Sequence, residues 1–302
     1  MCPADELGAF AVAPMAWYER LLAWILSLGP VPQSMGIIPD GNRRFATEHG
    51  ITVDQGHVAG SHTLSRVGTW SSLVGVKESI IYIFSADNFR RPQSEQDGLF
   101  QEISRRCQYI MDNSEGFRKG GRRIRCVGDL ELLPNHLQRL LARVDLATAD
   151  NNRTVLVACV AYSSRRQVTQ MTRRLAQAVK KGELRSDDIT TDLIDGYASL
   201  HDGAHVQLLL RTSGETRLSD FLLLQSSHAR LHFEPKNLPE IGFADYVWAL
   251  IDYQLQHQKL QVESHAPAVP IGTPIDQTLR KRSFLNHIRA ENATQLERLA
   301  HE

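Results

Sequence analysis

The stretch Val155-Leu156-Val157-Ala158-Cys159-Val160 decides the fold, because it places six apolar residues in an unbroken row. A strand with one face in water alternates apolar and polar side chains, whereas a strand covered on both faces is apolar throughout. We therefore predict that residues 154–161 form a buried strand of a parallel sheet that is covered by helices.

Further strands and helices are predicted on both sides of this stretch. Short apolar runs predict strands at residues 35–38, 79–85, 124–127, 206–210 and 231–233. Helical spacing of apolar residues is found at 95–119, 134–151, 165–181, 188–199 and 242–261, and a helix is also expected after residue 42. Because strands alternate with helices, the sequence predicts one α/β domain around a mainly parallel, six-stranded sheet.

The composition is that of an ordinary globular protein. Of 302 residues, 42% are hydrophobic and 23% are charged, and 34 basic residues balance 34 acidic ones. A nucleic-acid-binding protein would need an excess of positive charge, so we expect no nucleic acid as partner. The four cysteines form no Cys-x-x-Cys pair, and Cys126 and Cys159 fall in predicted strands. We expect buried thiols in a reducing compartment rather than disulfides or metal ligands.

Both ends of the chain differ from the central region, residues 35–261. In the N-terminal segment, residues 1–34, we expect disorder up to residue 15 and no signal peptide, because a basic start is missing. Apolar runs stay shorter than the roughly 18 residues that span a bilayer. The C-terminal segment, residues 262–302, reads as a linker followed by a polar helix without a core of its own.

Residues 16–28 predict a short amphipathic helix with an aromatic face. The side chains at helical spacing on this face are Trp17, Leu21, Trp24, Ile25 and Leu28. Such a face suits a membrane interface, and it equally suits packing on the folded domain. The sequence leaves both possibilities open.

The segment Asp40-Gly41-Asn42-Arg43-Arg44-Phe45 follows the strand predicted at 35–38. Gly41 and Asn42 permit a tight turn that aims N–H groups at an anion, and the two arginines add full positive charges. Asp40 suits a phosphate site if Mg²⁺ lies between its carboxylate and the phosphate oxygens. The alternative is a plain turn with two solvated arginines.

Two other polar clusters follow predicted strands. Ser85-Ala86-Asp87-Asn88-Phe89-Arg90-Arg91 comes after the strand at 79–85, where its alternative role is a helix-capping turn. Arg211-Thr212-Ser213-Gly214-Glu215-Thr216-Arg217-Leu218-Ser219-Asp220-Phe221 comes after the strand at 206–210, where its alternative is a surface loop with a Glu215–Arg217 contact. Ligands of open parallel sheets bind outside the carboxyl ends of strands. The three clusters together indicate two phosphate-bearing substrates in one cleft.

The residues of these clusters, in their order, resemble those of the cis-prenyltransferases, also called the undecaprenyl and dehydrodolichyl diphosphate synthase family. The resemblance covers residues 16 to about 261 and rests on five motifs in the family's order. The motifs are residues 36–46, 82–91, 124–129, 161–165 and 210–222. Arg43 and the Arg211-Thr212-Ser213-Gly214 wording resemble the eukaryotic, dolichol-type branch. The resemblance makes residues 35–261 the catalytic domain and excludes the all-α fold of trans-prenyltransferases.

The resemblance also implies a reaction. An allylic diphosphate such as farnesyl diphosphate is extended by isopentenyl diphosphate, with a cis double bond formed at each step. The expected product is a long-chain polyprenyl diphosphate for dolichol synthesis and protein glycosylation. An apolar tunnel must hold the growing chain, and the helix at 95–119 is expected to line it. The implied cofactor is Mg²⁺, and the implied location is the cytosolic face of the endoplasmic reticulum membrane, as a peripheral protein.

Residue roles are carried over from the family motif by motif. Asp40 matches the aspartate that handles Mg²⁺ and the diphosphates, and Ser85, Asn88 and His57 match catalytic residues near ionisation and proton removal. The predicted allylic-substrate and other binding residues are Gly41, Asn42, Arg43, Arg44, Phe45 and Arg91. The isopentenyl diphosphate site is expected at Arg211, Arg217 and Ser219.

Four departures from the family pattern stand out. Pro39 replaces a usual methionine, and Ile83 replaces a usual small residue on the tunnel wall, where it would narrow the tunnel. Arg230 stands where homodimeric bacterial members have a glutamate linked to metal binding. The Arg-x-Gly motif that homomeric members use across their interface is missing from the C-terminal residues. We therefore expect a homologous, non-catalytic partner subunit that supplies it.

Two alternatives keep the same fold. One is a non-catalytic interaction subunit, which the retention of Asp40, Asn88, Arg211 and Arg217 disfavours. The other is an enzyme that makes a shorter or cyclised terpenoid, which Ile83 leaves open. A generic phosphate-binding α/β protein is disfavoured by the five ordered motifs.

Overall fold

Six strands form a single, entirely parallel sheet in the computed structural model of the chain, which describes residues 15–200, 205–264 and 275–301. Their order across the sheet is β3-β4-β2-β1-β5-β6. The strands are β1 (Ser34–Ile38), β2 (Glu78–Ser85), β3 (Arg122–Val127), β4 (Thr154–Tyr162), β5 (Leu208–Arg211) and β6 (Arg230–Phe233). The predicted α/β fold is confirmed, and the sheet is parallel throughout rather than mainly.

Ten α-helices and four short 3₁₀ helices are found in the described residues. The α-helices are α1 (Trp17–Ser27), α2 (Asn42–Glu48), α3 (Val53–Val74), α4 (Gln93–Asp112), α5 (Ser114–Lys119), α6 (Asn135–Ala147), α7 (Ser164–Lys180), α8 (Thr191–Ala198), α9 (Phe243–Ser264) and α10 (Ile275–His301). The 3₁₀ helices are η1 (Ala86–Arg90), η2 (Leu130–Leu132), η3 (Ser186–Asp188) and η4 (Leu238–Glu240). None of the helices in the described ranges combines the length and hydropathy needed to cross a bilayer.

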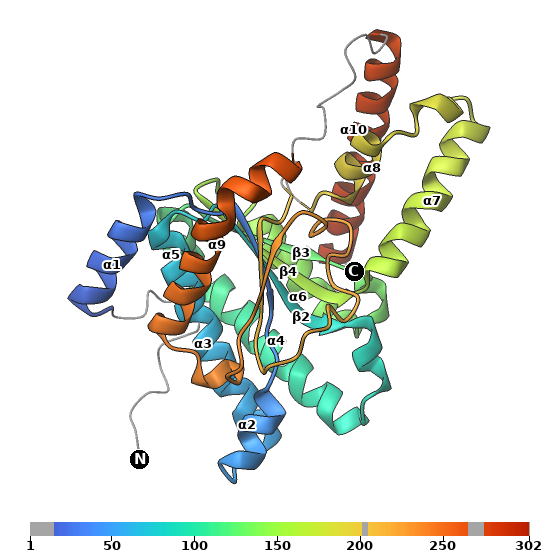
Figure 1. The fold of residues 1–302 in the computed structure, drawn as a ribbon. Helices are drawn as coiled ribbons and strands as arrows, with labels where there is room; N and C mark the ends of the chain where they lie inside the picture. Colours follow the sequence, from blue (N-terminus) through green and yellow to red (C-terminus); the bar gives the residue numbers. More distant parts are fainter. Residues whose placement is uncertain (1–14, 201–204, 265–274, 302) are drawn as a thin grey trace.

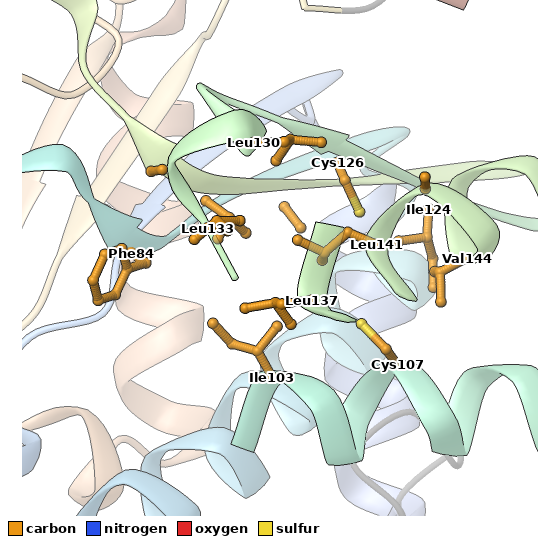
Figure 2. Close-up of a cluster of buried hydrophobic side chains, with 14 of the residues drawn as sticks. Phe84, Ile103, Cys107, Ile124, Cys126, Leu130, Leu133, Leu137, Leu141 and Val144 are labelled. Atoms are coloured by element: carbon orange, nitrogen blue, oxygen red, sulfur yellow. The ribbon is translucent and has the colours of Figure 1, made fainter. Parts of the chain in front are cut away.

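Helices cover both faces of the sheet, as the pattern of β4 requires (Figure 1). On one face, α3 and α9 pack against β1 and β5, and α4 and α6 pack against β3 and β4. Figure 2 shows Ile103 and Cys107 of α4 facing Leu137 and Leu141 of α6 within this layer. On the other face, the segment that follows β5 covers the sheet, with α7 and α8 beyond it. The cysteines Cys107, Cys126 and Cys159 are free and buried, as predicted for the strand cysteines.

The order of the strands reverses at β1, which lies between β2 and β5. From β1 the chain goes on to β2 on one side, and from β5 it goes on to β6 on the other side. The connections that follow β1 and β5 therefore run in opposite directions. Ligands of open α/β sheets bind in the crevice at such a point, outside the carboxyl ends of the strands. The segments after β1 and β5 are the first and third polar clusters.

Two helix predictions need correction. The segment after Asn42 holds two helices, and the second, α3, has 22 residues. It carries Gly56, Gly60 and Gly68 together with Ser and Thr, which lower helix propensity and hid the helical pattern. The predicted helix at 95–119 is broken at Asn113 into α4 and α5.

The predicted helix at 16–28 is confirmed as α1, and its aromatic face is exposed to solvent. The exposed fractions are 76% for Trp17, 58% for Trp24 and 69% for Leu28. The opposite side, with Ala23 and Leu26, packs into the cluster formed by α3 and α9. The side of α1 that carries Ala23 and Leu26 therefore packs on the domain, and the aromatic face stays exposed. Residues 1–14, expected to be disordered, lie outside the described residues.

The predicted polar terminal helix is confirmed as α10, which is anchored to the domain. Arg280 makes a bidentate contact with the buried Asp188 at 2.7 and 2.8 Å. Phe284 and Ile288 join the cluster of α7 and α8, whereas Leu299 joins that of α4 and α6. Packing thus comes from contacts with other helices, and the linker expected before α10 falls mostly outside the described residues.

Replacing Phe284 by Ala is expected to lower the free energy of unfolding by about 3 to 5 kcal/mol, the usual range for removing a buried phenylalanine. Phe284 is 5% exposed and stacks near Tyr197. Leu279→Ala on the same helix is the matched control, because Leu279 is 60% exposed and should change stability by less than about 0.5 kcal/mol. Urea unfolding of both variants tests this, and equal effects would mean that α10 is not anchored as described.

Candidate active site

Asp40 and Arg211 form the centre of the site, at the carboxyl ends of the neighbouring strands β1 and β5. Nη2 of Arg211 donates to Oδ2 of Asp40 at 2.7 Å, and the arginine side chain is 3% exposed while the aspartate is 39% exposed. Thr212 reinforces the junction, since its Oγ1 accepts from the backbone N–H of Asp40 at 2.8 Å and donates to the Asp40 carbonyl at 2.7 Å. A buried cation thus holds a carboxylate that still faces the crevice.

Gly41 is required by the turn that follows Asp40. Its φ is 99°, in the left-handed region, and its N–H donates to Oδ1 of Asp40 at 2.8 Å. A Cβ at this position would lie 2.5 Å from Oδ1 of Asn237 and 2.8 Å from its Cα. Both the backbone conformation and the close approach therefore exclude a side chain.

The loop after β5 has an unusual backbone that brings Ser219 to Arg211. Ser213, Ser219, Asp220 and Leu222 have φ values of 77°, 50°, 63° and 49°. Each such residue costs of order 1 kcal/mol and must be held by its surroundings. Oγ of Ser219 accepts from Nη1 of Arg211 at 2.8 Å, and the same guanidinium donates to the carbonyl of Arg217.

The first and third clusters share further contacts through Arg44. Its Nη1 donates to the Ser213 carbonyl at 2.9 Å, and its Nη2 lies 3.5 Å from Oε1 of Glu215. Glu215 also pairs with Arg217. The surface-loop contact considered for Glu215 and Arg217 is therefore present, and it coexists with the contact to Arg44.

The second cluster is connected to the first through Glu95, at the start of α4. Oε1 of Glu95 lies 2.9 Å from Nη1 of Arg91 and 3.6 Å from Nη1 of Arg43. Burial lowers the pKa of Arg91. Two predicted binding arginines from separate clusters thus face one carboxylate.

Ser85 and Asn88 lie next to each other and cap η1. The N–H of Ser85 donates to Oδ1 of Asn88 at 2.8 Å, and Oγ of Ser85 accepts from the N–H of Asp87 at 3.0 Å. The capping turn considered for this segment is therefore formed. Phe45 of α2, in contrast, packs against His49 just after that helix, with ring centroids 4.0 Å apart.

His57 lies on α3 beside Asn42, whose Nδ2 is 3.3 Å from Nδ1 of the imidazole. Nε2 of His57 is buried and makes no hydrogen bond in the structure. Burial, together with the charge of Arg91, lowers the pKa of His57 to about 4. The imidazole is therefore neutral around pH 7.

The shifted pKa of His57 predicts how stability changes with pH. Below pH 6.5 the unfolded chain binds a proton at this residue, whereas the folded protein does not until pH falls to about 4. Stability is thus lost as pH falls through this window, by about 3 kcal/mol from His57. Urea unfolding at pH 7 and pH 4.5 should show a smaller acid loss for His57→Gln than for the parent. His49→Gln, at an exposed position just after α2, is the control, and an unchanged acid loss in His57→Gln would contradict the assignment.

Thr212, Glu95 and Glu215 are functional candidates that motif reasoning did not select. Thr212 and Glu215 belong to the third cluster. They were not selected because only the cationic and hydroxyl groups that could bind a diphosphate were chosen there, and not the groups that hold the cluster in place. Glu95 follows Arg91 by four residues, which is the spacing of an ion pair at a helix start. That spacing was the only available signal for it.

A mostly apolar cavity of about 190 Å³ lies beside the site, and Pro39 and His57 are among the residues that line it. Its walls come from α3, α4 and the strands β2, β3 and β4, and Ile83 is one of the lining residues. The predicted helix wall is thus confirmed in α4. Residues of α5 and α6 also line the cavity, and a further wall comes from α3, the helix that the sequence pattern had not revealed.

Arg230, one of the departures from the family pattern, makes a bidentate contact with Asp252 of α9 at 2.8 and 2.9 Å. His232 also lies 3.1 Å from the same carboxylate. A cation at this position is therefore paired within the chain itself. Within the described residues, no group of three or more His, Cys, Asp or Glu side chains is arranged to hold a metal.

The fold and the site define a class of protein. Arg211 beside Asp40, together with Arg43 and Arg91 beside Glu95, suits a phosphorylated substrate, and the adjoining cavity suits a hydrocarbon. These features are typical of an α/β protein that binds phosphorylated compounds with apolar tails.

Comparisons with known proteins identify the family. Residues 38–261 match the prenyltransferase family model described as undecaprenyl diphosphate synthase. The dehydrodolichyl diphosphate synthase complex subunits of Homo sapiens and Mus musculus are each 38% identical over 247 residues, or 82% of this chain and 74% of theirs. The solved structure of lavandulyl diphosphate synthase from Lavandula x intermedia, in complex with dimethylallyl diphosphate, matches with a TM-score of 0.70 and 30% identity. It covers 74% of this chain and 95% of that one. The chain belongs to the undecaprenyl diphosphate synthase family and is a cis-prenyltransferase.

Proposed function

We propose that this enzyme condenses isopentenyl diphosphate onto an allylic diphosphate such as farnesyl diphosphate and repeats the step to build a long-chain polyprenyl diphosphate. The observation that carries the proposal is the Asp40–Arg211 contact, which lies next to Pro39, one of the residues that line the apolar cavity. It brings the first and third polar clusters into one crevice. Two diphosphates can be bound there while the hydrocarbon lies in the cavity.

The chemistry requires positive charge where the leaving diphosphate develops negative charge. Arg43 and Arg44 beside β1 and Arg91 beside β2 supply it on the allylic side, in our assignment. On the other side, Arg211, Arg217 and Ser219 bind isopentenyl diphosphate. We assign His57, which lines the cavity, to the residues around the proton that is lost when the cis double bond forms.

Mg²⁺ fits the proposed site. This ion binds proteins through one or two carboxylates and completes its shell with water and substrate phosphates. Asp40 offers one partly exposed carboxylate next to Pro39, which lines the cavity. When bound, Mg²⁺ would neutralise charge on the diphosphate and assist its departure.

The names of the relatives support our proposal for the pathway in which the enzyme acts. The human and mouse relatives are named dehydrodolichyl diphosphate synthase complex subunits. We assign this chain to dolichol synthesis at the cytosolic face of the endoplasmic reticulum membrane. There it would act with a homologous, non-catalytic partner that supplies the Arg-x-Gly motif.

Peripheral membrane contact is assigned to α1. Tryptophan and aliphatic side chains on one exposed face are typical of helices that lie in a membrane interface. Trp17→Ser combined with Trp24→Ser should reduce sedimentation with phospholipid vesicles at least about fivefold. The reason is that the double substitution removes both indole rings from the exposed face. Trp248→Ser is the matched control, because Trp248 is 61% exposed on α9. Equal losses in both variants would argue against a specific role of α1.

The proposed reaction is tested by turnover. The purified chain is incubated with farnesyl diphosphate, labelled isopentenyl diphosphate and Mg²⁺, alone and with the candidate partner. We expect long-chain product with the partner and little without it. Full activity of the chain alone would exclude the required partner, and inactivity in both cases would favour a non-catalytic subunit. A product that stops after a single condensation would favour a short terpenoid, as the name of the lavandulyl enzyme suggests.

A further inference from the structure

The wall of the apolar cavity contains an ion pair. Glu102 and Arg106 of α4 both line the cavity, with Nε of Arg106 2.6 Å from Oε1 of Glu102. Their side chains are only 12% and 15% exposed. Burial lowers the pKa of Arg106 to about 10. A charged pair in the path of a hydrocarbon is unexpected, because charges are costly to remove from water.

The position of the pair along the cavity follows from the direction of α4. The helix starts at the active site, where Glu95 contacts Arg91 and Arg43, and runs away from it. With a rise of 1.5 Å per residue, Glu102 lies about 10 Å and Arg106 about 16 Å beyond Glu95. The cavity is also lined by Lys77 and Thr154, at the amino ends of β2 and β4. A growing chain therefore reaches the pair only after it has filled the first part of the cavity.

The opposite wall leaves space at Gly68. This residue of α3 lines the cavity, and a Cβ built on it would meet no atom within 4 Å. Glycine inside a helix costs roughly 1 kcal/mol relative to alanine, so the open space has a price in stability. The cavity is thus kept passable at Gly68 of α3, and α4 contributes a buried ion pair to its wall.

We propose that the Glu102–Arg106 pair is a length checkpoint, at which a growing chain either is released or extends over the pair and displaces its water. Each isoprenoid unit that is added before the chain reaches the pair buries further apolar surface in the cavity. At the pair, this gain is offset by the desolvation of the two charges. Release then competes with the next condensation, and the share of shorter product is set by the pair. The proposal rests on the proposed function, because it takes the cavity to hold the prenyl chain.

Binding of saturated alkyl diphosphates tests the checkpoint without turnover. Calorimetry with Mg²⁺ and the full chain gives the affinity at each tail length. In the parent we expect the affinity to rise about fourfold per methylene for short tails. It should stop rising once the tail reaches the pair. In the double variant Glu102→Leu with Arg106→Leu, the rise should continue to longer tails.

Single substitutions should have the opposite effect to the double variant. Glu102→Leu leaves Arg106 without its carboxylate, so affinity should fall for tails that reach it. Arg105→Leu is the matched control, because Arg105 also contacts Glu102 but is 61% exposed and is not among the residues that line the cavity. It should keep the plateau of the parent. Gly68→Leu should weaken only long tails, which shows that tails pass this point.

The outcomes separate the two proposals. If even short alkyl diphosphates fail to bind, the proposed function is wrong and the checkpoint falls with it. If short tails bind but the parent gains evenly at every length, only the checkpoint is wrong. It is equally overturned if the double variant keeps the plateau, or if Glu102→Leu behaves like the double variant. Product lengths from the active complex should follow the same order, with the smallest share of short product in the double variant.

Discussion

Asp40→Asn is expected to lower the rate of condensation by at least about 100-fold while the protein remains folded, as removal of one group that stabilises transition-state charge typically does. The amide keeps an oxygen that can accept from the N–H of Gly41, so the turn is preserved. It loses the charge that faces Arg211 and that would bind Mg²⁺. Initial rates with labelled isopentenyl diphosphate measure the effect.

A matched control is available in Asp252→Asn. Asp252 also contacts an arginine, Arg230, at 2.8 Å, but it lies on α9 away from the carboxyl end of β1. This variant should retain activity within about threefold of the parent, because surface ion pairs contribute little. Full activity of Asp40→Asn would refute the assigned role of the first cluster.

Arg211→Met is expected to lower kcat/KM for isopentenyl diphosphate by at least about 100-fold, with most of the change in KM. The guanidinium is buried and makes three contacts, to Asp40, to Ser219 and to the carbonyl of Arg217. Methionine has a similar length and cannot make any of them. The affinity for the allylic diphosphate should change less, because Arg43 and Arg44 remain.

The control for this variant is Arg230→Met, on the neighbouring strand β6. Arg230 has a bidentate partner in Asp252, yet its side chain is 38% exposed. A similar loss in both variants would mean that Arg211 acts through general stability. Thermal unfolding of both proteins separates loss of folding from loss of binding.

The sheet was predictable because its strands follow a local rule. A row of apolar residues such as Val155–Val160 can be explained only by burial on both faces, and β4 has that environment. The clusters were predictable for the same reason, since each follows a strand. Sequence spacing could not predict which side chains from different segments contact each other. The contact of Glu95 with Arg43 joins residues that no local pattern relates.

The helix α3 shows why the rest was missed. Its Gly and Ser residues weaken the helical pattern, and the helix is held by buried side chains such as Val67 and Trp70. At Gly68 the missing side chain leaves cavity space. The residues that obscured the helix are thus among those that make room for a hydrocarbon. The exposed aromatic face of α1 was likewise undecidable from spacing, because either side of an amphipathic helix can pack.

The most direct test of the account is whether two diphosphates bind at once. Calorimetry with isopentenyl diphosphate is carried out on the chain together with its candidate partner, before and after saturation with farnesyl thiolodiphosphate, an unreactive allylic analogue, in the presence of Mg²⁺. The account predicts simultaneous binding, with Arg211→Met impairing only the isopentenyl site and Arg44→Met only the allylic site. Competition of the two ligands for a single site, or equal losses from both substitutions, would contradict it.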